Sequence, residues 1–176
     1  VVGVPDSGIP AAIGYSKASG IPYDVGLIKN KYIGRTFIQP GQDKRERSVR
    51  IKLNALRNNL EGKRVILVDD SIVRGTTCAR LVKILKDAGA KEVHMRIASP
   101  PVLYPCHFGT DVPDREYLIA YGRTVEEIRE LIGVDSLGYL SLEATNKIAV
   151  GATCGFCNGC FSGEYPIEVP DTVEKN

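Results

Sequence analysis

The stretch VILVDDSIVRGTT, residues 65–77, indicates how this chain folds. Its first four residues are apolar, which is typical of a buried strand in a sheet covered on both faces. Two acids, Asp69 and Asp70, close the strand, and Gly75-Thr76-Thr77 begins a segment with helical periodicity. A strand that leads through a short connection into a helix is the unit from which parallel, doubly wound sheets are built.

The same alternation continues on both sides of this stretch. Strands are expected at 1–4, 23–28, 64–68 and 92–98, and helices at 8–19, 46–60 and 76–88. The helix at 46–60 is predicted from an apolar stripe at i, i+4, i+7 and i+11, made by Val49, Leu53, Leu56 and Leu60. Gly89 is the expected C-cap of the helix at 76–88. The chain is therefore assigned to the α/β class, with a doubly wound, mainly parallel sheet.

The character of the sequence changes after residue 100. A proline-rich exit is followed by a short helix whose start has Thr124 and Glu127 spaced as a capping box, and then by a Gly/Cys loop. We expect a core at 1–100 and a C-terminal helical, cysteine-rich extension at 101–176. The chain has no initiator methionine and starts within an expected strand, so we expect the core to be truncated at its N-terminus.

Composition excludes several classes of protein. The 176 residues suit one α/β domain with a full core. The formal net charge of +2 argues against nucleic-acid binding through bulk electrostatics. No apolar run approaches the ~20 residues of a membrane span, and no leader opens the chain. We therefore expect a cytoplasmic protein that binds neither nucleic acid nor membrane.

The position of the two acids predicts a ligand site. In doubly wound sheets ligands bind beyond the carboxyl ends of the strands, where Asp69 and Asp70 lie. The backbone N–H groups and hydroxyls of Gly75, Thr76 and Thr77 face an anion there, with the helix dipole behind them. A single Asp at this place is more often a turn former or a helix cap. A pair of acids beside a phosphate loop favours a phosphorylated sugar, with the acids accepting from ribose hydroxyls or holding Mg²⁺.

Two further stretches carry candidate chemistry. Residues 29–45 hold five Lys/Arg, two glycines and a proline, and are either a solvated basic loop or a functional one. Cys154, Cys157 and Cys160 form C-x-x-C-x-x-C, with Cys106 far upstream. This spacing resembles that of iron–sulfur ligands, although tetrahedral zinc or a set of free thiols also fits it. Cys78, one turn into a helix, is expected to be a small packed residue.

These motifs resemble a known family. VILVDDSIVRGTT resembles the phosphoribosyl diphosphate (PRPP) signature of the type I phosphoribosyltransferases. Residues 1–16 (VVGVPDSGIPAAIGYS) and 26–45 (GLIKNKYIGRTFIQPGQDKR) resemble glutamine PRPP amidotransferases in particular. The likeness continues through RIASPPVLYPCHFG at 96–109 to the cysteine cluster, which places the chain with the iron–sulfur subgroup. It implies the type I phosphoribosyltransferase fold.

The resemblance also implies roles for individual residues. Asp69 and Asp70 would bind the ribose hydroxyls and, with Ser7, would surround Mg²⁺. The 5′-phosphate would be held by Ser71, Arg74, Gly75, Thr76 and Thr77. The diphosphate would lie on the loop that contains Asp6 and Gly8. A basic lid would close over PRPP with Lys29, Tyr32 and Arg35.

The implied reaction is the transfer of ammonia to C1 of PRPP, which gives 5-phosphoribosylamine and diphosphate at the start of purine synthesis. Full enzymes of the family take ammonia from glutamine in an N-terminal glutaminase domain, to which nothing here corresponds, so this chain would supply the PRPP-binding part and need not be active alone. The subgroup carries a [4Fe–4S] cluster, for which Cys106, Cys157 and Cys160 would be three ligands, with the fourth outside this chain. Purine nucleotides as inhibitors and a homotetramer are also implied. The alternative is a regulatory module that senses PRPP or a nucleotide on the same fold.

Overall fold

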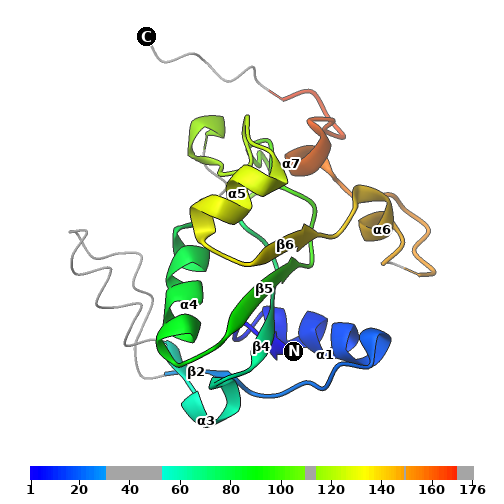
Figure 1. Cartoon of the computed structure of the whole chain (residues 1–176). Helices are drawn as coiled ribbons and strands as arrows, with labels where there is room; N and C mark the ends of the chain where they lie inside the picture. Colours follow the sequence, from blue (N-terminus) through cyan, green and yellow to red (C-terminus); the bar gives the residue numbers. More distant parts are fainter. Residues whose placement is uncertain (31–52, 110–113, 149, 170–176) are drawn as a thin grey trace.

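A four-stranded parallel sheet forms the centre of the molecule (Figure 1). The computed structural model describes residues 1–30, 53–109, 114–148 and 150–169. The strands are β1 (Val2–Gly3), β4 (Arg64–Asp69), β5 (Glu92–Ile97) and β6 (Ser136–Tyr139), in the spatial order β1-β4-β5-β6. All three pairings are parallel, which confirms the predicted sheet and the strands expected at 1–4, 64–68 and 92–98. The sequence did not predict β6.

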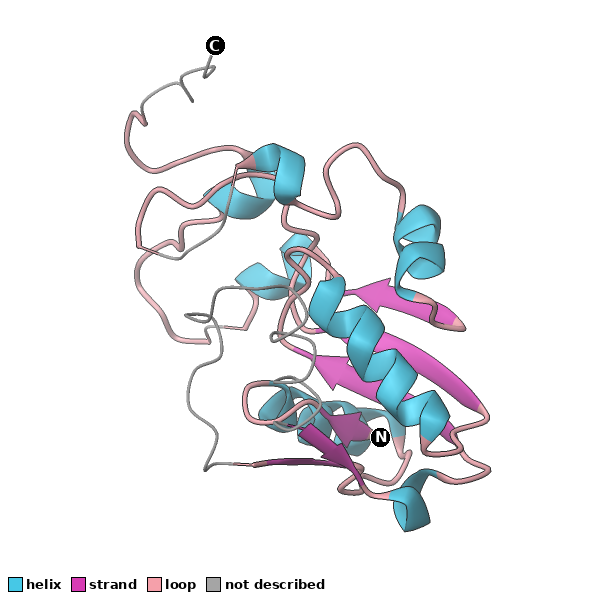
Figure 2. Cartoon of the chain, turned by 90° about the vertical axis from the view of Figure 1, so that its left-hand side faces the viewer, coloured by secondary structure: helices cyan, strands magenta, loops and turns pink. Residues whose placement is uncertain are grey.

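Helices cover the sheet on both sides, as a doubly wound fold requires. Helix α1 (Gly8–Ser19) packs against β1 and β4, on the face opposite to α4 (Figures 1 and 2). Helix α4 (Thr76–Asp87) contacts β5 and α5 (Val125–Ile132), and α5 contacts β6. The helices predicted at 8–19 and 76–88 are confirmed. The C-cap of α4 is Ala88 rather than Gly89, which follows it with a φ of +93°.

A separate two-stranded sheet corrects two predictions. β2 (Leu27–Lys29) pairs antiparallel with β3 (Leu53–Ala55), and α3 (Arg57–Leu60) follows. The strand expected at 23–28 therefore does not join the parallel sheet. The helix expected at 46–60 is wrong over 53–56, because a strand and a short helix can bury Leu53 and Leu60 as well as one helix can. The rest of that expected helix, residues 46–52, lies outside the described residues.

One hydrophobic core runs through the sheet and past residue 100. It includes Leu67 and Met95 from the strands and Ile128, Ile132 and Val134 from α5 and the turn after it, each at most 3% exposed. The predicted capping box at the start of α5 is confirmed. Thr124 N donates to the Glu127 carboxylate at 2.7 Å, and Glu127 N donates to Thr124 Oγ1 at 3.3 Å. The first part of the expected extension thus belongs to the same packed unit as the core.

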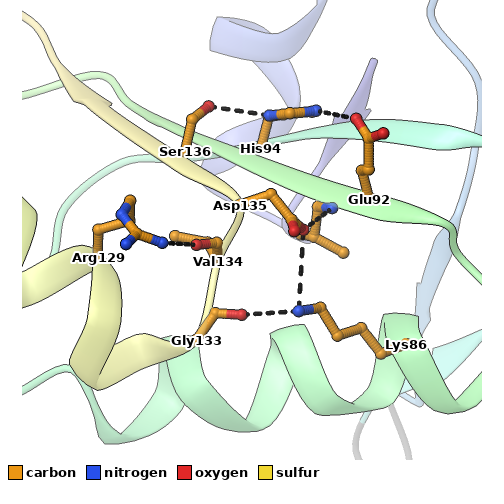
Figure 3. Close-up of polar contacts among 9 residues, drawn as sticks. Lys86, Glu92, His94, Arg129, Gly133, Val134, Asp135 and Ser136 are labelled. Atoms are coloured by element: carbon orange, nitrogen blue, oxygen red, sulfur yellow. Dashed lines mark hydrogen bonds and ion pairs between the residues drawn. The ribbon is translucent and has the colours of Figure 1, made fainter.

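Polar contacts fix the amino-terminal ends of β5 and β6, away from the edge that carries the two acids (Figure 3). His94 lies between Ser136 Oγ, 2.9 Å from Nδ1, and the Glu92 carboxylate, 3.0 Å from Nε2. The Asp135 carboxylate accepts the N–H of Val93 at 2.7 Å. This hydrogen bond lowers the pKa of Asp135. These contacts tie the two strands together in register.

The rest of the C-terminal part is built from short elements. The 3₁₀ helix η2 (Arg115–Tyr117) precedes α5, and α6 (Leu142–Asn146) and α7 (Gly159–Ser162) follow β6. The connection after β5 is held to α7, because the N–H groups of Leu103 and Tyr104 both donate to Cys160 O, at 2.9 and 3.0 Å. Within the described ranges, no helix has the length and apolar character needed to span a membrane.

Candidate functional site

Two loops meet at the carboxyl ends of the neighbouring strands β1 and β4. The first is residues 5–8, which begin with a cis Pro5–Asp6 bond and lead into α1; the second is residues 69–77, which lead into α4. Ser7 Oγ donates to Asp70 Oδ1 at 3.0 Å across the gap between them. The structure thus brings together two segments that are more than 60 residues apart, as the family resemblance implied for Ser7 and the two acids.

Gly8 allows this close approach. A Cβ at Gly8 would lie 2.5 Å from the backbone oxygen of Val68, so any larger residue would push α1 away from β4. Its own N–H donates to Val4 O at 2.9 Å. Gly8 therefore contributes space, and its amide is already engaged within the loop.

The two acids have different environments. Asp69 is buried, with 7% exposure, whereas Asp70 is exposed. Asp70 N donates to Asp69 Oδ1 at 2.9 Å. Burial raises the pKa of Asp69 to about 8, and the hydrogen bond and charge of Asp70 add to that rise. Burial acts against the ionised form of Asp70 too, but hydrogen bonds from Asp69 and Ser7 outweigh it and lower the pKa of Asp70.

At neutral pH the pair therefore holds one proton, on Asp69, and one negative charge, on Asp70. Two carboxylates this close cannot both ionise cheaply without a cation. A divalent cation would supply that charge, and oxygen ligands from two carboxylates and a hydroxyl suit Mg²⁺, which keeps several waters or substrate oxygens. The donor set of Asp69, Asp70 and Ser7 fits the magnesium expected there.

The start of α4 provides a place for an anion. Gly75 is the N-cap residue, with a φ of +78°, and having no side chain it leaves the end of the helix uncapped. Thr76 and Thr77 are exposed in the first turn, and no acid lies in that turn. The first N–H groups of a helix have no acceptor within it, and its dipole favours negative charge. Phosphate oxygens complement this end of the helix.

The remaining predicted residues of this site are placed as follows. Lys29, at the end of β2, forms an ion pair with Asp6, so the loop at 5–8 contacts the start of the basic segment. Arg74 is exposed, and its guanidinium lies 5.9 Å from the centre of the Tyr117 ring. Ser71 Oγ is 3.4 Å from Asp70 Oδ2. Tyr32 and Arg35 lie outside the described residues.

The cysteines differ in their burial. Cys78 is buried, Cys106 and Cys160 are half-buried, and Cys154 and Cys157 are exposed. Burial raises the pKa of the Cys160 thiol, and the charges of Cys106 and Cys157 add to this rise. In the part of the chain that the structure describes, no three His, Cys, Asp or Glu side chains are placed so as to hold a metal ion. The choice of Cys106, Cys157 and Cys160 as cluster ligands stays a prediction.

The buried residues beneath the acid pair were not predicted to be part of the site. Cys78 is buried, as expected for a packed residue, and burial, with the charges of Asp69 and Asp70, raises its pKa to about 12. Tyr139, at the end of β6, is in register with Ile97, which is in register with Asp69. Its buried hydroxyl has no hydrogen-bond partner within the described residues. The floor of the site is thus buried, and burial is the main cause of the raised pKa of Asp69.

The sequence also missed Ile119. Its side chain covers Gly75, since a Cβ at Gly75 would lie 2.3 Å from Ile119 Cδ1. Leu118, Ile119 and Ala120 form a short buried apolar run. That run is visible in the sequence, but nothing in it shows which distant loop it contacts.

Comparisons with known proteins identify the family of the chain. The family model described as "Phosphoribosyl transferase domain" matches residues 1–98. The chain therefore belongs to the phosphoribosyltransferase domain family.

More particularly, the chain is similar over its whole length to amidophosphoribosyltransferases. It is 58% identical to that of Synechococcus elongatus over 100% of its length, and 56% identical to that of Bacillus subtilis over 98%. It covers only 36% and 37% of those two proteins. A solved structure of the glutamine PRPP amidotransferase from B. subtilis, complexed with ADP and GMP, is 55% identical and superimposes with a TM-score of 0.83, over 97% of this chain and 38% of that one. The predicted family resemblance and fold are confirmed.

Proposed function

We propose that this chain is the PRPP-binding part of an amidophosphoribosyltransferase, which transfers ammonia, derived from glutamine in a full enzyme, to C1 of PRPP. The observation that carries the proposal is the buried–exposed acid pair, Asp69 and Asp70, next to the uncapped start of α4. One end of this site suits a phosphate and the other suits a pair of ribose hydroxyls. A phosphorylated ribose has both groups.

Some residues of the site bind the substrate, and others stabilise the charge that develops in the reaction. Displacing diphosphate from C1 builds positive character on the sugar, and the ionised Asp70 stabilises positive charge nearby. Ser71, Arg74 and Gly75–Thr77, which we call the phosphate loop, hold the 5′-phosphate and so fix the sugar's position. Asp6, Ser7 and Gly8 form the turn on which the diphosphate lies.

Mg²⁺ would be held by Asp69, Asp70 and Ser7, and would offset the charge of the departing diphosphate. Lys29 reaches the loop at 5–8 through Asp6 and is the one described member of the proposed lid. Tyr32 and Arg35 would complete the lid, which excludes water that would otherwise hydrolyse the cationic sugar.

Titration calorimetry of the chain with PRPP, with and without Mg²⁺, tests this function. We expect Mg²⁺-dependent binding that is lost in Asp69→Asn/Asp70→Asn. Asp87→Asn is the matched control, since Asp87 is an exposed acid at the other end of α4. Absence of Mg²⁺-dependent PRPP binding, or its survival in the double variant, would show that the site is wrongly assigned.

We also propose that Cys106, Cys157 and Cys160 supply three ligands of a [4Fe–4S] cluster, with the fourth from outside this chain. The support is the C-x-x-C-x-x-C spacing, together with the influence of Cys106 and Cys157 on the pKa of Cys160. The cluster has no part in a displacement that is redox-neutral, so its role is structural or regulatory. In full-length protein prepared anaerobically, the broad visible absorption should be lost in Cys157→Ser and kept in Cys154→Ser; the reverse would overturn the choice of ligands.

The partners of the whole protein are part of the same proposal. The B. subtilis neighbour was solved with ADP and GMP, which supports purine nucleotides as inhibitors of this chain's full enzyme. We propose a homotetramer in the cytoplasm. The sensor alternative gains no support from the relatives reported above, which are all named as enzymes.

A further inference from the structure

We propose that residues 114–121 form a brace that sets the shape of the phosphate loop, with Ile119 as its positioning residue. This inference rests on the proposed function, because it takes residues 71–77 as the place where the 5′-phosphate binds. The brace belongs to the C-terminal part of the chain, beyond residues 1–98, over which the family model matches.

Ile119 holds the phosphate loop through its backbone and through its side chain. Its N–H donates to Val73 O at 2.8 Å, in the middle of the loop. Its side chain, with the residue only 9% exposed, lies directly on Gly75. Ile119 therefore restrains both the bend at Val73 and Gly75, the N-cap residue of α4.

The phosphate loop needs such support because of Gly75. Glycine populates positive and negative φ about equally, so its φ of +78° is not selected by the residue itself. The direction of the N–H groups of Thr76 and Thr77 depends on that angle. Packing by Ile119 against the bare Cα favours the observed conformation, and so orients these donors before a ligand arrives.

The brace also positions a charge. The Arg74 guanidinium lies 5.9 Å from the centre of the Tyr117 ring, within the range of a cation–π interaction. Arg74 is exposed, so without this contact its long side chain would sample many rotamers. Tyr117 reduces that freedom next to the expected phosphate.

The brace is itself anchored firmly enough to act in this way. Leu118 is fully buried in the core. The Arg115 guanidinium lies between two rings, 4.2 Å from the centre of Tyr104 and 5.6 Å from that of Tyr121. Arg123 Nη1 donates to Ile119 O at 3.2 Å. Contacts on both sides of Ile119 therefore hold it against the loop.

Ile119→Ala and Ile128→Ala form a matched pair that tests the brace. Both remove the same atoms from a buried isoleucine, but Ile128 lies in α5 and is 1% exposed in the core. By calorimetry, we expect the affinity for ribose 5-phosphate to fall about tenfold in Ile119→Ala and to stay within twofold in Ile128→Ala, although both variants lose stability. Ile119→Val removes only Cδ1, the atom nearest Gly75, and should give an affinity between those of the unaltered chain and Ile119→Ala. Equal losses of affinity in the two alanine variants would reduce Ile119 to an ordinary core residue and overturn the proposal.

Tyr117 gives a second test that does not depend on a buried residue. It is 57% exposed, so its variants should fold normally. Tyr117→Leu should weaken ribose 5-phosphate binding severalfold, and Tyr117→Phe should not, because the ring is kept. Unchanged affinity in Tyr117→Leu would show that the brace does not position Arg74.

Amide hydrogen exchange separates this inference from the proposed function. In the absence of ligand, the N–H groups of residue 119 and of Ala79, which donate to Val73 O and Gly75 O, should exchange faster in Ile119→Ala than in Ile128→Ala. If the unaltered chain binds neither PRPP nor ribose 5-phosphate, the proposed function fails, and the exchange rates still decide whether the brace holds the loop. Equal exchange in both variants would overturn the brace.

Discussion

The burial of Asp69 destabilises the folded protein when its carboxyl group is ionised. Its place in the candidate site explains why an acid is kept there. Its pKa is raised from an ordinary value of 3.8 to about 8, mainly by burial. A raised pKa means that the folded state binds the proton more tightly than the unfolded state. The contribution of Asp69 to stability is therefore fully present below about pH 4 and is lost as the pH rises through about 8.

Asp69→Asn should remove this loss. The amide can still accept from Asp70 N and can donate to the Asp70 carboxylate, as the protonated acid does. We expect the variant to be more stable than the unaltered chain by a few kcal/mol at pH 9, and little different at pH 4.5, while it loses PRPP binding. Urea unfolding across this pH range measures the difference. Parallel pH profiles for the two proteins would show that Asp69 is not the group that titrates.

At this scale the sequence predicted the acids and the phosphate loop, but not their relation to the rest of the molecule. Asp69 is the last residue of β4 and is buried with the sheet, whereas Asp70 lies beyond the strand and is exposed, but the apolar pattern does not show where the strand ends. The contact of Ile119 with Gly75 joins residues 44 positions apart, and local periodicity carries no information about such a pair. The roles of Tyr32 and Arg35 stay predictions.

The capping box shows how far a local motif determines an element. Thr124 and Glu127 exchange hydrogen bonds as their spacing predicts, and α5 begins at the next residue, Val125. Thr124→Ala should cost about 1 kcal/mol of unfolding free energy, since it leaves the N–H of Glu127 without its acceptor. Urea unfolding at neutral pH measures the loss.

Thr124→Ser is the control for this prediction, because serine keeps the accepting oxygen. It should cost much less than the alanine variant. Similar losses in both would mean that the methyl group, rather than the cap, stabilises the start of α5.

The wrong prediction at this scale has an equally local cause. Residues 53–60 carry apolar positions at helical spacing, yet Leu53–Ala55 is a strand because β2 offers it a partner. Backbone pairing between segments about 25 residues apart outweighed a pattern that both structures satisfy. Such competition is decided by tertiary contacts, which a single sequence does not display.

At the scale of the whole molecule, the hydrophobic core extends beyond the residues that the family model matches. The family model stops at residue 98, whereas β6 pairs with β5, and Ile119, Ile128 and Val134 are buried in the common core. The fold class followed from the alternation of strands and helices. The extent of the folding unit did not, because β6 is short and contains a glycine.

A chain that ends at residue 100 should therefore not fold cooperatively. It would expose the apolar faces of α4 and β5 that α5 and β6 cover, and would lose the brace. We expect it to lack a sharp thermal transition by circular dichroism, whereas a chain that ends at residue 140 should keep one. A sharp transition in the shorter chain would show that the first 100 residues form an independent unit.

The aromatic residues of the brace give the molecule an optical property. The chain has eight tyrosines and no tryptophan, so tyrosine dominates its near-ultraviolet absorption. Tyr104, Tyr117 and Tyr121 all stack with an arginine of the brace or of the phosphate loop. A phosphate bound beside the Arg74 guanidinium changes the electric field on the Tyr117 ring, and with it the tyrosine spectrum. Ligand binding at the phosphate loop can therefore be followed by the near-ultraviolet absorption of tyrosine, without a dye or a label.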